Sequence, residues 1–185
     1  MKRIFSLMAV CLLALGLAAC GSSPGSSPAS SGEPKDYVTI LTDARPAEDN
    51  ESLVIFHLKD GVYTATGGYA ADLTEEDIAS QGAMCLQVLG LTEEDVEEAA
   101  FSVSMMNVQS YGLAIVKPAD GKEAAVTEGL QTFIDGQKAA QENYLADQYA
   151  IAKAAKLDTV KSGEVVLVMC EEQDAVFSSI KNALA

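Results

Sequence analysis

The first 34 residues confine any folded core to the remainder of the chain. Residues 2–17 begin with two basic side chains and continue as an apolar stretch, which is too short for an ordinary membrane span and is typical of a signal peptide. Leu17-Ala18-Ala19 precedes Cys20, an arrangement at which bacterial lipoproteins are lipidated and cleaved. We therefore expect residues 1–19 to be removed and Cys20 to carry a diacylglycerol; a plain secretory signal with an incidental thiol is the alternative.

A flexible tether is expected to follow the lipidated cysteine. Residues 21–34 consist of Gly, Ser, Pro and Ala with a single Glu, a composition that cannot bury enough apolar surface to fold. Residues 20–36 would then form the tether, whose flexible part has a root-mean-square reach of about 20 Å. Two acyl chains make such an attachment effectively permanent. The sequence thus predicts one domain, residues 37–185, at the outer face of the bacterial cytoplasmic membrane.

The chain is strongly acidic, with 12 Lys and Arg against 27 Asp and Glu and a net charge of −15. This charge is repelled by nucleic acid and by anionic membrane surfaces. We therefore expect no nucleic-acid partner, and contact with the membrane only through the lipid on Cys20. Cations and basic partners are compatible with the charge.

Two of the four cysteines, Cys85 and Cys170, belong to the expected domain. Cys85 falls on an apolar helical stripe and Cys170 ends an apolar strand, where a free cysteine often packs as a small hydrophobe. A disulfide between them is the alternative, because export places the domain in an oxidising setting.

The expected domain begins with segments that predict a hairpin. Residues 53–58 and 62–66 are β-prone and flank Asp60-Gly61, a dipeptide typical of hairpin turns. Before them, residues 37–41 fit a short strand or a helix. Residues 42–52 are polar and contain a proline, so they predict a loop.

The pentapeptide Leu-Thr-Glu-Glu-Asp occurs twice, at residues 73–77 and 91–95. In both copies the threonine fits a helix N-cap, and the acids suit the first turn, where the helix dipole favours negative charge. The first copy opens a helix whose apolar stripe ends at Gly90, and the second opens a short helix. Capping explains these acids better than a calcium site, because no loop spaces them as an EF-hand does.

Two strands and a long helix are expected next. Residues 101–105 alternate apolar and polar, and residues 111–116 are β-prone on both faces. We expect them to pair across a turn near residues 107–110; one long bent strand is the alternative. An amphipathic helix follows over residues 122–143, and its pattern continues to Ala155.

The last segments predict a hairpin over residues 157–170 and a closing helix over residues 175–184. The second strand of this hairpin is apolar on both faces, so it should be central or covered. We predict an α+β fold: an antiparallel sheet built from two hairpins, in the order helix, hairpin, helix, hairpin, helix, with the helices packed on the sheet.

Several short segments resemble a known family. They are Met105-Met106-Asn107-Val108, Ile115-Val116-Lys117, Asp120-Gly121-Lys122, Tyr144–Tyr149 and Val165–Met169. Over roughly residues 92–184 the chain is similar to an uncharacterised family of Gram-positive bacterial lipoproteins, catalogued as a domain of unknown function (4358). The resemblance implies fold and location and no activity. Members often carry proline at the position of Ala146, which leaves open whether the long helix breaks there.

No group of residues in the sequence predicts a catalytic site, a metal site or a cofactor. His57 is the single histidine, and we expect it to face solvent from a strand. Ser178-Ser179-Ile180-Lys181 matches the serine and lysine spacing of penicillin-recognising enzymes. It follows Lys161-Ser162-Gly163, whereas the order in those enzymes is the reverse, so we interpret the match as coincidence.

Two short segments are candidates for contact with a ligand or a partner. One is an apolar run that could form an adaptable patch for a partner, although core packing is the favoured interpretation. The other places aromatic and polar side chains on neighbouring helical positions, where tyrosine rings that pack inward are the commoner explanation. The candidate residues are Met105, Met106, Asn107, Tyr144, Asp147, Gln148 and Tyr149.

These observations predict a membrane-anchored extracytoplasmic module that binds a protein, a glycan or a small solute and catalyses no reaction. One alternative is an envelope-acting hydrolase or transferase that uses a carboxylate pair. Another is an accessory subunit of an exporter or a signalling complex. An enclosed cavity with a buried carboxyl group of raised pKa would favour the enzyme, and an exposed apolar patch would favour a protein partner.

Overall fold

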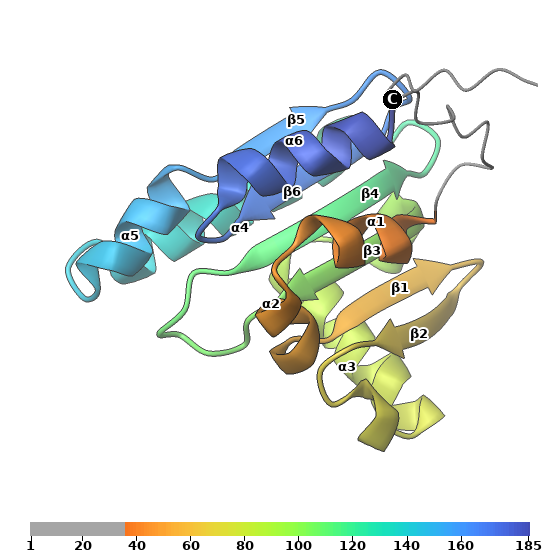
Figure 1. The fold of residues 1–185 in the computed structure, drawn as a ribbon. Coiled ribbons are helices and arrows are strands. Elements are labelled where there is room, and N and C mark those ends of the chain that lie inside the picture. Colours follow the sequence, from red (N-terminus) through yellow and green to blue (C-terminus); the bar gives the residue numbers. More distant parts are fainter. Residues whose placement is uncertain (1–35) are drawn as a thin grey trace, which may run out of the picture. The chain divides into compact units, whose positions relative to one another are not determined.

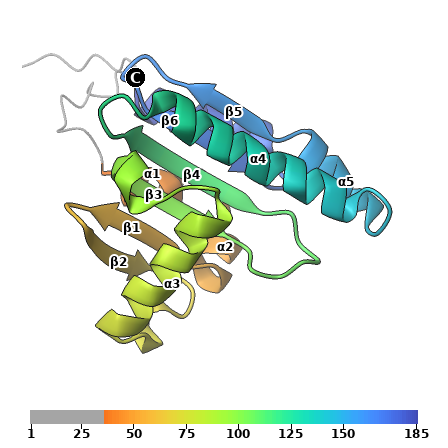
Figure 2. The same ribbon diagram turned by 180° about the vertical axis from the view of Figure 1, so that it is seen from behind.

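A six-stranded antiparallel sheet forms the middle layer of the fold, with helices against both of its faces (Figure 1, Figure 2). The computed structural model describes residues 36–185, so the expected signal peptide, Cys20 and nearly all of the expected tether lie outside the described residues. The helices and strands are α1 (Tyr37–Ala44), α2 (Ala47–Ser52), β1 (Ile55–Lys59), β2 (Val62–Thr66), α3 (Glu75–Val88), β3 (Val96–Val103), β4 (Gly112–Pro118), α4 (Glu123–Gln141), α5 (Ala146–Lys153), β5 (Lys156–Thr159), β6 (Val165–Met169) and α6 (Gln173–Ala183).

The strand order is β2-β1-β3-β4-β6-β5, and every neighbouring pair is antiparallel. The predicted α+β class and antiparallel sheet are therefore confirmed. The expected number of hairpins was wrong: β1–β2, β3–β4 and β5–β6 make three. The first hairpin joins the sheet through the second edge of β1, which pairs with β3 so that Phe56 lies opposite Phe101.

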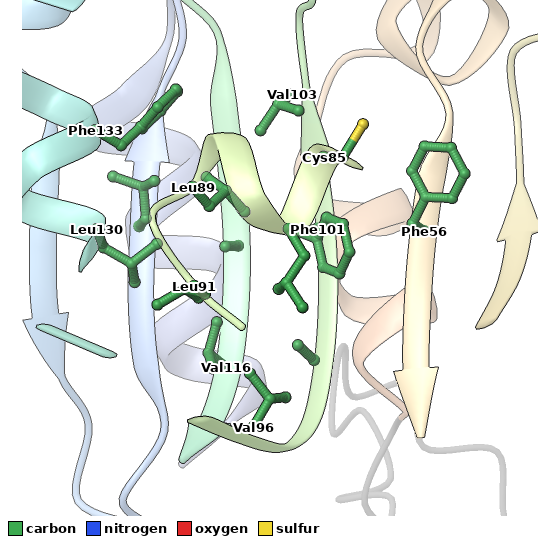
Figure 3. Close-up of a cluster of buried hydrophobic side chains, with 14 of the residues drawn as sticks. Phe56, Cys85, Leu89, Leu91, Val96, Phe101, Val103, Val116, Leu130 and Phe133 are labelled. Carbon is green, nitrogen blue, oxygen red and sulfur yellow. The ribbon is translucent and has the colours of Figure 1, made fainter. Parts of the chain in front are cut away.

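Two apolar clusters fill the spaces between the sheet and its helices. On one face α3 packs on β1, β2 and β3, while α4 packs on β4, β5 and β6. Figure 3 shows this cluster, to which Leu89, Leu130 and Phe133 of the helical layer and Phe101 of the sheet all belong. On the other face α1 and α6 cover the sheet and contact each other. The predicted covered strand is confirmed, since every residue of β6 is buried.

The polar stretch over residues 42–52 is not a loop throughout, because α2 occupies its second half. Pro46 directly precedes the first helical residue, near a helix start, where the missing N–H of proline does no harm. Glu48 and Asp49 then occupy the first turn. Residues 37–41, which fitted either a strand or a helix, belong to α1. This helix is capped by Asp36, whose carboxylate accepts a hydrogen bond from the backbone N–H of Thr39 at 2.9 Å.

In both copies of the repeated pentapeptide the threonine is the N-cap, as predicted, and each copy also forms a capping box. Thr74 and Asp77 cap α3, and Thr92 and Asp95 cap a single 3-10 turn. Strand β3 then begins at once, earlier than the expected start near residue 101, and it ends before Met105. The register shifts at the beginning of this strand, which breaks the alternation that would have revealed it.

The paired strands expected over residues 101–116 are present, and the single bent strand is excluded because β3 and β4 form a ladder of hydrogen bonds. The long helical pattern over residues 122–155 divides into α4 and α5. Ala146 is the first residue of α5, a position that proline favours. A proline at this position would therefore be compatible with the break.

The two cysteines of the domain are free, and both are buried. They cannot form the alternative disulfide because Cys85 packs in the cluster beneath α3 and Cys170 packs on the opposite face of the sheet. Burial raises the pKa of the Cys85 thiol to about 11.

The sequence suggested that His57 faces solvent, but the structure shows that its side chain is largely covered. Its side chain is 16% exposed, and Nε2 lies 2.9 Å from Oε1 of Glu98 on the neighbouring β3. Lys59 donates to the other oxygen of the same carboxylate at 3.0 Å. Burial alone raises the pKa of Glu98, but the hydrogen bonds from Lys59 and His57 outweigh burial and lower it overall.

The segment that follows α3 touches α4 through two glycines. Gly90 has a φ of 76°, which suits the residue after a helix end. A Cβ atom on Gly129 would lie 2.5 Å from the carbonyl oxygen of Gly90 and 2.8 Å from Cδ2 of Leu91. The absence of a side chain at Gly129 therefore sets how closely α4 approaches the sheet.

We predict that Gly129→Ala destabilises the protein by about 1 to 3 kcal/mol, because the new methyl group overlaps backbone atoms that cannot move aside. Gly136→Ala in the same helix is the matched control. A Cβ atom there meets nothing within 4 Å, so it should stabilise the helix by about 0.5 to 1 kcal/mol. Urea unfolding of both variants measures the difference, and equal stabilities would contradict the proposed close contact.

Candidate functional site

A cavity of about 310 Å³ lies at the end of the sheet where β6 finishes. Four parts of the chain line it: α2, the β3–β4 loop (residues 104–111), α5 and the connection from β6 to α6. These parts lie near the same end of the sheet (Figure 1). The cavity therefore forms only when segments more than 100 residues apart in the sequence come together.

Two glutamine side chains hold the β3–β4 loop in place. Nε2 of Gln141, at the end of α4, donates to the carbonyl oxygen of Asn107 at 2.7 Å. Oε1 of Gln148, on α5, accepts from the backbone N–H of Ser110 at 2.8 Å. The loop is thus fixed to both helices, and Gln148 also contributes to the cavity wall.

A buried arginine next to the cavity holds one of the wall residues, Tyr111, in place. Arg45 is 4% exposed, and its guanidinium donates to Oγ of Ser102 at 3.0 Å and to the hydroxyl of Tyr111 at 3.4 Å. It also donates to Oδ1 of Asn50 at 2.6 Å and to the carbonyl oxygen of Leu53 at 2.8 Å. Because these bonds connect α2, β3 and the start of β4, Arg45 fixes the position of Tyr111 in the wall.

The cavity wall is acidic. Glu48, Asp49, Glu171 and Glu172 line it, and no lysine or arginine does. The thiol of Cys170 in the same wall is affected by this charge. Burial raises its pKa most, and the negative charges of Asp49, Glu171 and Glu172 raise it further, to about 12.

Tyr111 experiences both the arginine and the acids. Burial raises the pKa of its phenol, and the carboxylate of Asp49 raises it further. The guanidinium of Arg45 acts in the opposite direction without reversing the shift. The phenol therefore stays neutral over the physiological pH range.

Ser110 carries a buried hydroxyl that no protein group satisfies. The residue is 2% exposed and lines the cavity, and within residues 36–185 its Oγ has no hydrogen-bond partner. An unmet hydroxyl is costly in a folded interior, so such groups are uncommon and call for an explanation. Ser102 makes the contrast, since its equally buried hydroxyl accepts from Arg45.

The structure places the predicted contact residues around this cavity, but only Gln148 lines it. Met105 and Met106 are 52% and 59% exposed in the β3–β4 loop, so the favoured interpretation of core packing was wrong for both. Tyr144 is 65% exposed between α4 and α5, and Tyr149 is half-buried. Asn107 and Asp147 are exposed as well. A role of these side chains in binding stays a prediction.

Most of the cavity residues were missed from the sequence. Arg45 and Asp49 fell in the stretch taken for a loop, and Ser110 lay in an expected turn. One signal was available: Glu171-Glu172 follows directly after a wholly apolar strand, and polar residues at the end of a covered strand often line a site. This signal does not show which other segments of the chain line the cavity together with Glu171 and Glu172.

Other kinds of site are absent from the part of the chain that the structure describes. Among residues 36–185 no three His, Cys, Asp or Glu side chains are grouped so that they could hold a metal ion. The helices within this range also include none with the length and apolar character needed to cross a membrane.

The fold and the cavity define a mixed α+β domain with a polar cavity at one end of an antiparallel sheet. The chain belongs to the family described as Domain of unknown function (DUF4358), whose model matches residues 69–170. This confirms the family suggested by the resemblance; the match begins earlier than residue 92 and ends before α6. The matched range includes the β3–β4 loop and α5, whereas Glu48, Asp49, Glu171 and Glu172 lie outside it. Comparisons with curated proteins and with solved structures gave no match.

We predict that the two buried serines respond differently to loss of their hydroxyls. Ser102→Ala should lower the free energy of unfolding by about 1 to 3 kcal/mol, because it leaves a guanidinium N–H unsatisfied. Ser110→Ala removes a hydroxyl without a partner, so we expect a change within about 0.5 kcal/mol or a slight stabilisation. Urea unfolding tests the pair; a loss in Ser110→Ala as large as in Ser102→Ala would mean that Ser110 Oγ does have a partner.

Proposed function

We propose that the protein is a lipid-anchored, extracytoplasmic binding module whose cavity takes a small solute without catalysing a reaction. The observation that carries the proposal is the cavity with the unsatisfied hydroxyl of Ser110 in its wall. Its volume of about 310 Å³ is at the small end of the range for ligand sites, which suits a solute better than a polymer chain.

The position of the tether end supports this proposal. The described chain begins at Asp36, and the hydroxyl of Tyr37 donates to Oε1 of Glu164 at 2.8 Å. Glu164 directly precedes β6, whereas the cavity lies beyond the other end of that strand. A strand of five residues is about 17 Å long, so the two positions are separated by at least that length. The first described residues therefore lie toward the end of β6 opposite the cavity.

The carboxyl groups favour binding over catalysis. A hydrolase that works with a carboxylate pair needs one member protonated, which requires a raised pKa. Throughout residues 36–185, each carboxyl group with a shifted pKa is shifted downward, so all of these groups favour the charged form. These eight carboxylates are thus suited to ion pairing and capping.

A second candidate function is that of an accessory subunit with a protein partner. The β3–β4 loop exposes Met105, Met106 and Val108, and the turn after α4 exposes Tyr144. The loop and the end of α4 are joined by the hydrogen bond from Gln141 to Asn107. Exposed methionines adapt to varied partner surfaces, and clustered apolar side chains are typical of contact sites. This candidate and solute binding are compatible.

We predict that Cys20 determines where the protein resides. In a Gram-positive host the full chain should fractionate with membranes and incorporate an alkyne-labelled fatty acid, whereas Cys20→Ser should lose the label and appear in the medium. Cys11→Ser is the matched control, because that cysteine would leave with the signal peptide. If all three proteins distribute alike, the lipid anchor is wrong.

We predict that filling the cavity abolishes solute binding. Gln109 is half-buried in the wall, and its neighbour Val108 is exposed outside it. Thermal unfolding of the acylated full chain in detergent is measured with cationic amines, neutral sugars and anionic acids. A solute at 100 times its Kd should raise Tm by roughly 5 to 10 °C in wild type and Val108→Trp, and should leave Gln109→Trp unchanged. The cavity is no binding site if every solute acts equally on all three proteins or on none.

A further inference from the structure

We infer that the cavity binds an extended organic cation with primary ammonium groups, either a free polyamine or the lysine side chains of a peptide. The inference rests on the proposed function, because it names the class of ligand for the same cavity. It is argued from the charge of the wall, the separation of its carboxylates and the unsatisfied hydroxyl of Ser110.

The carboxylates of the cavity are not among the six that form ion pairs within residues 36–185. Along the strands and their connections, acids pair with lysines, as in Glu97 with Lys117 at 2.7 Å and Asp158 with Lys181 at 2.6 Å. Within residues 36–185, none of the four carboxylates in the cavity wall forms such an ion pair. They come from two separate segments, α2 and the β6–α6 connection, so negative charge lies on two parts of the wall. A bound cation would neutralise both.

An organic cation fits this arrangement better than a metal ion does. A metal requires several carboxylates around one point, and the carboxylates of residues 36–185 form no such group. The wall also includes Pro46, Ile151 and Tyr111, whose apolar atoms are suited to contact with methylene groups. Charged groups separated by an apolar stretch match a chain of ammonium groups joined by methylenes.

The hydroxyl of Ser110 completes the recognition of an ammonium group. A primary ammonium has three N–H donors and no acceptor, so it needs acceptors alone. Ser110 Oγ can accept one hydrogen bond, and the carboxylates can accept the others.

An anion is disfavoured in the same cavity even though a buried arginine lies nearby. Arg45 stands behind Tyr111 and directs its hydrogen bonds to Asn50, Ser102, Tyr111 and Leu53. Arg45 is not part of the cavity wall, and its guanidinium is already used to position the phenol of Tyr111. An anion would therefore face the carboxylates without a cationic partner in the wall.

The experiment is calorimetric titration of the acylated full chain in detergent, at about 150 mM NaCl, with spermidine and with a short lysine-containing peptide. Glucose and glutamate are the neutral and anionic probes. We expect saturable binding of at least one cationic probe, and the stronger of the two identifies the source of the ammonium groups. Ser110→Ala should weaken it about tenfold, since one hydrogen bond to a charged group is lost.

A matched pair of double variants separates a site from general attraction to an acidic protein. Glu171→Gln with Glu172→Gln removes two charges from the wall and should weaken binding at least tenfold. Glu75→Gln with Glu76→Gln removes two exposed charges from the first turn of α3, outside the wall, and should change affinity less than twofold. Equal losses in the two double variants, together with no effect of Ser110→Ala, would overturn the inference.

The other outcomes distinguish the two proposals. If glucose or glutamate binds and Gln109→Trp abolishes that binding, while neither cation binds, the cation is wrong and the binding module stands. If no probe here and no solute of the thermal panel binds in a manner sensitive to Gln109→Trp, both proposals fail.

Discussion

Burial of β4 and β6 on both faces is the constraint on which the rest of the structure depends. All five residues of β6 and the first five of β4 are buried, and these two strands pair with each other. Each fully buried aliphatic side chain contributes about 1.5 to 3 kcal/mol, so neither face of these strands can be left to water. Two layers of helix follow from this requirement: α3 and α4 on one side, α1 and α6 on the other. Gly129 lets the α4 layer approach closely.

The cavity lies where this covering stops. Helices cover the length of the central strands, but the ends of β3 and β6 run into connections that must close the sheet in another way. Polar groups meet there, and they are satisfied by Arg45, Gln141 and Gln148, whose side chains join the loop to the helices. Within residues 36–185, the hydroxyl of Ser110 has no hydrogen-bond partner and the four carboxylates of the cavity wall form no ion pair. We associate function with this end of the molecule because these polar groups are free to interact with a ligand.

The family match divides the cavity wall in an informative way. It covers the β3–β4 loop and α5, which supply Ser110 and Gln148, and it ends at Cys170. The acidic residues that give the wall its charge lie on either side of the matched range. The hydroxyl and the amide therefore belong to the part of the fold that the family model describes, and the negative charge comes from the flanking segments of this chain.

Local interactions in the sequence were sufficient to predict much of the fold. Capping boxes at Thr74 and Thr92, the Asp60-Gly61 turn and the fully apolar β6 depend on residues close together in the chain, so their patterns are visible without a structure. The strand order, the third hairpin in the sheet and the exposure of Met105 depend on what packs against each segment, which periodicity does not encode. The cavity is the extreme case. Its wall joins Asp49, Ser110, Gln148 and Glu172, and only tertiary packing brings these residues to one place, because hydrophobic burial is non-directional and leaves the choice of neighbours to the whole chain.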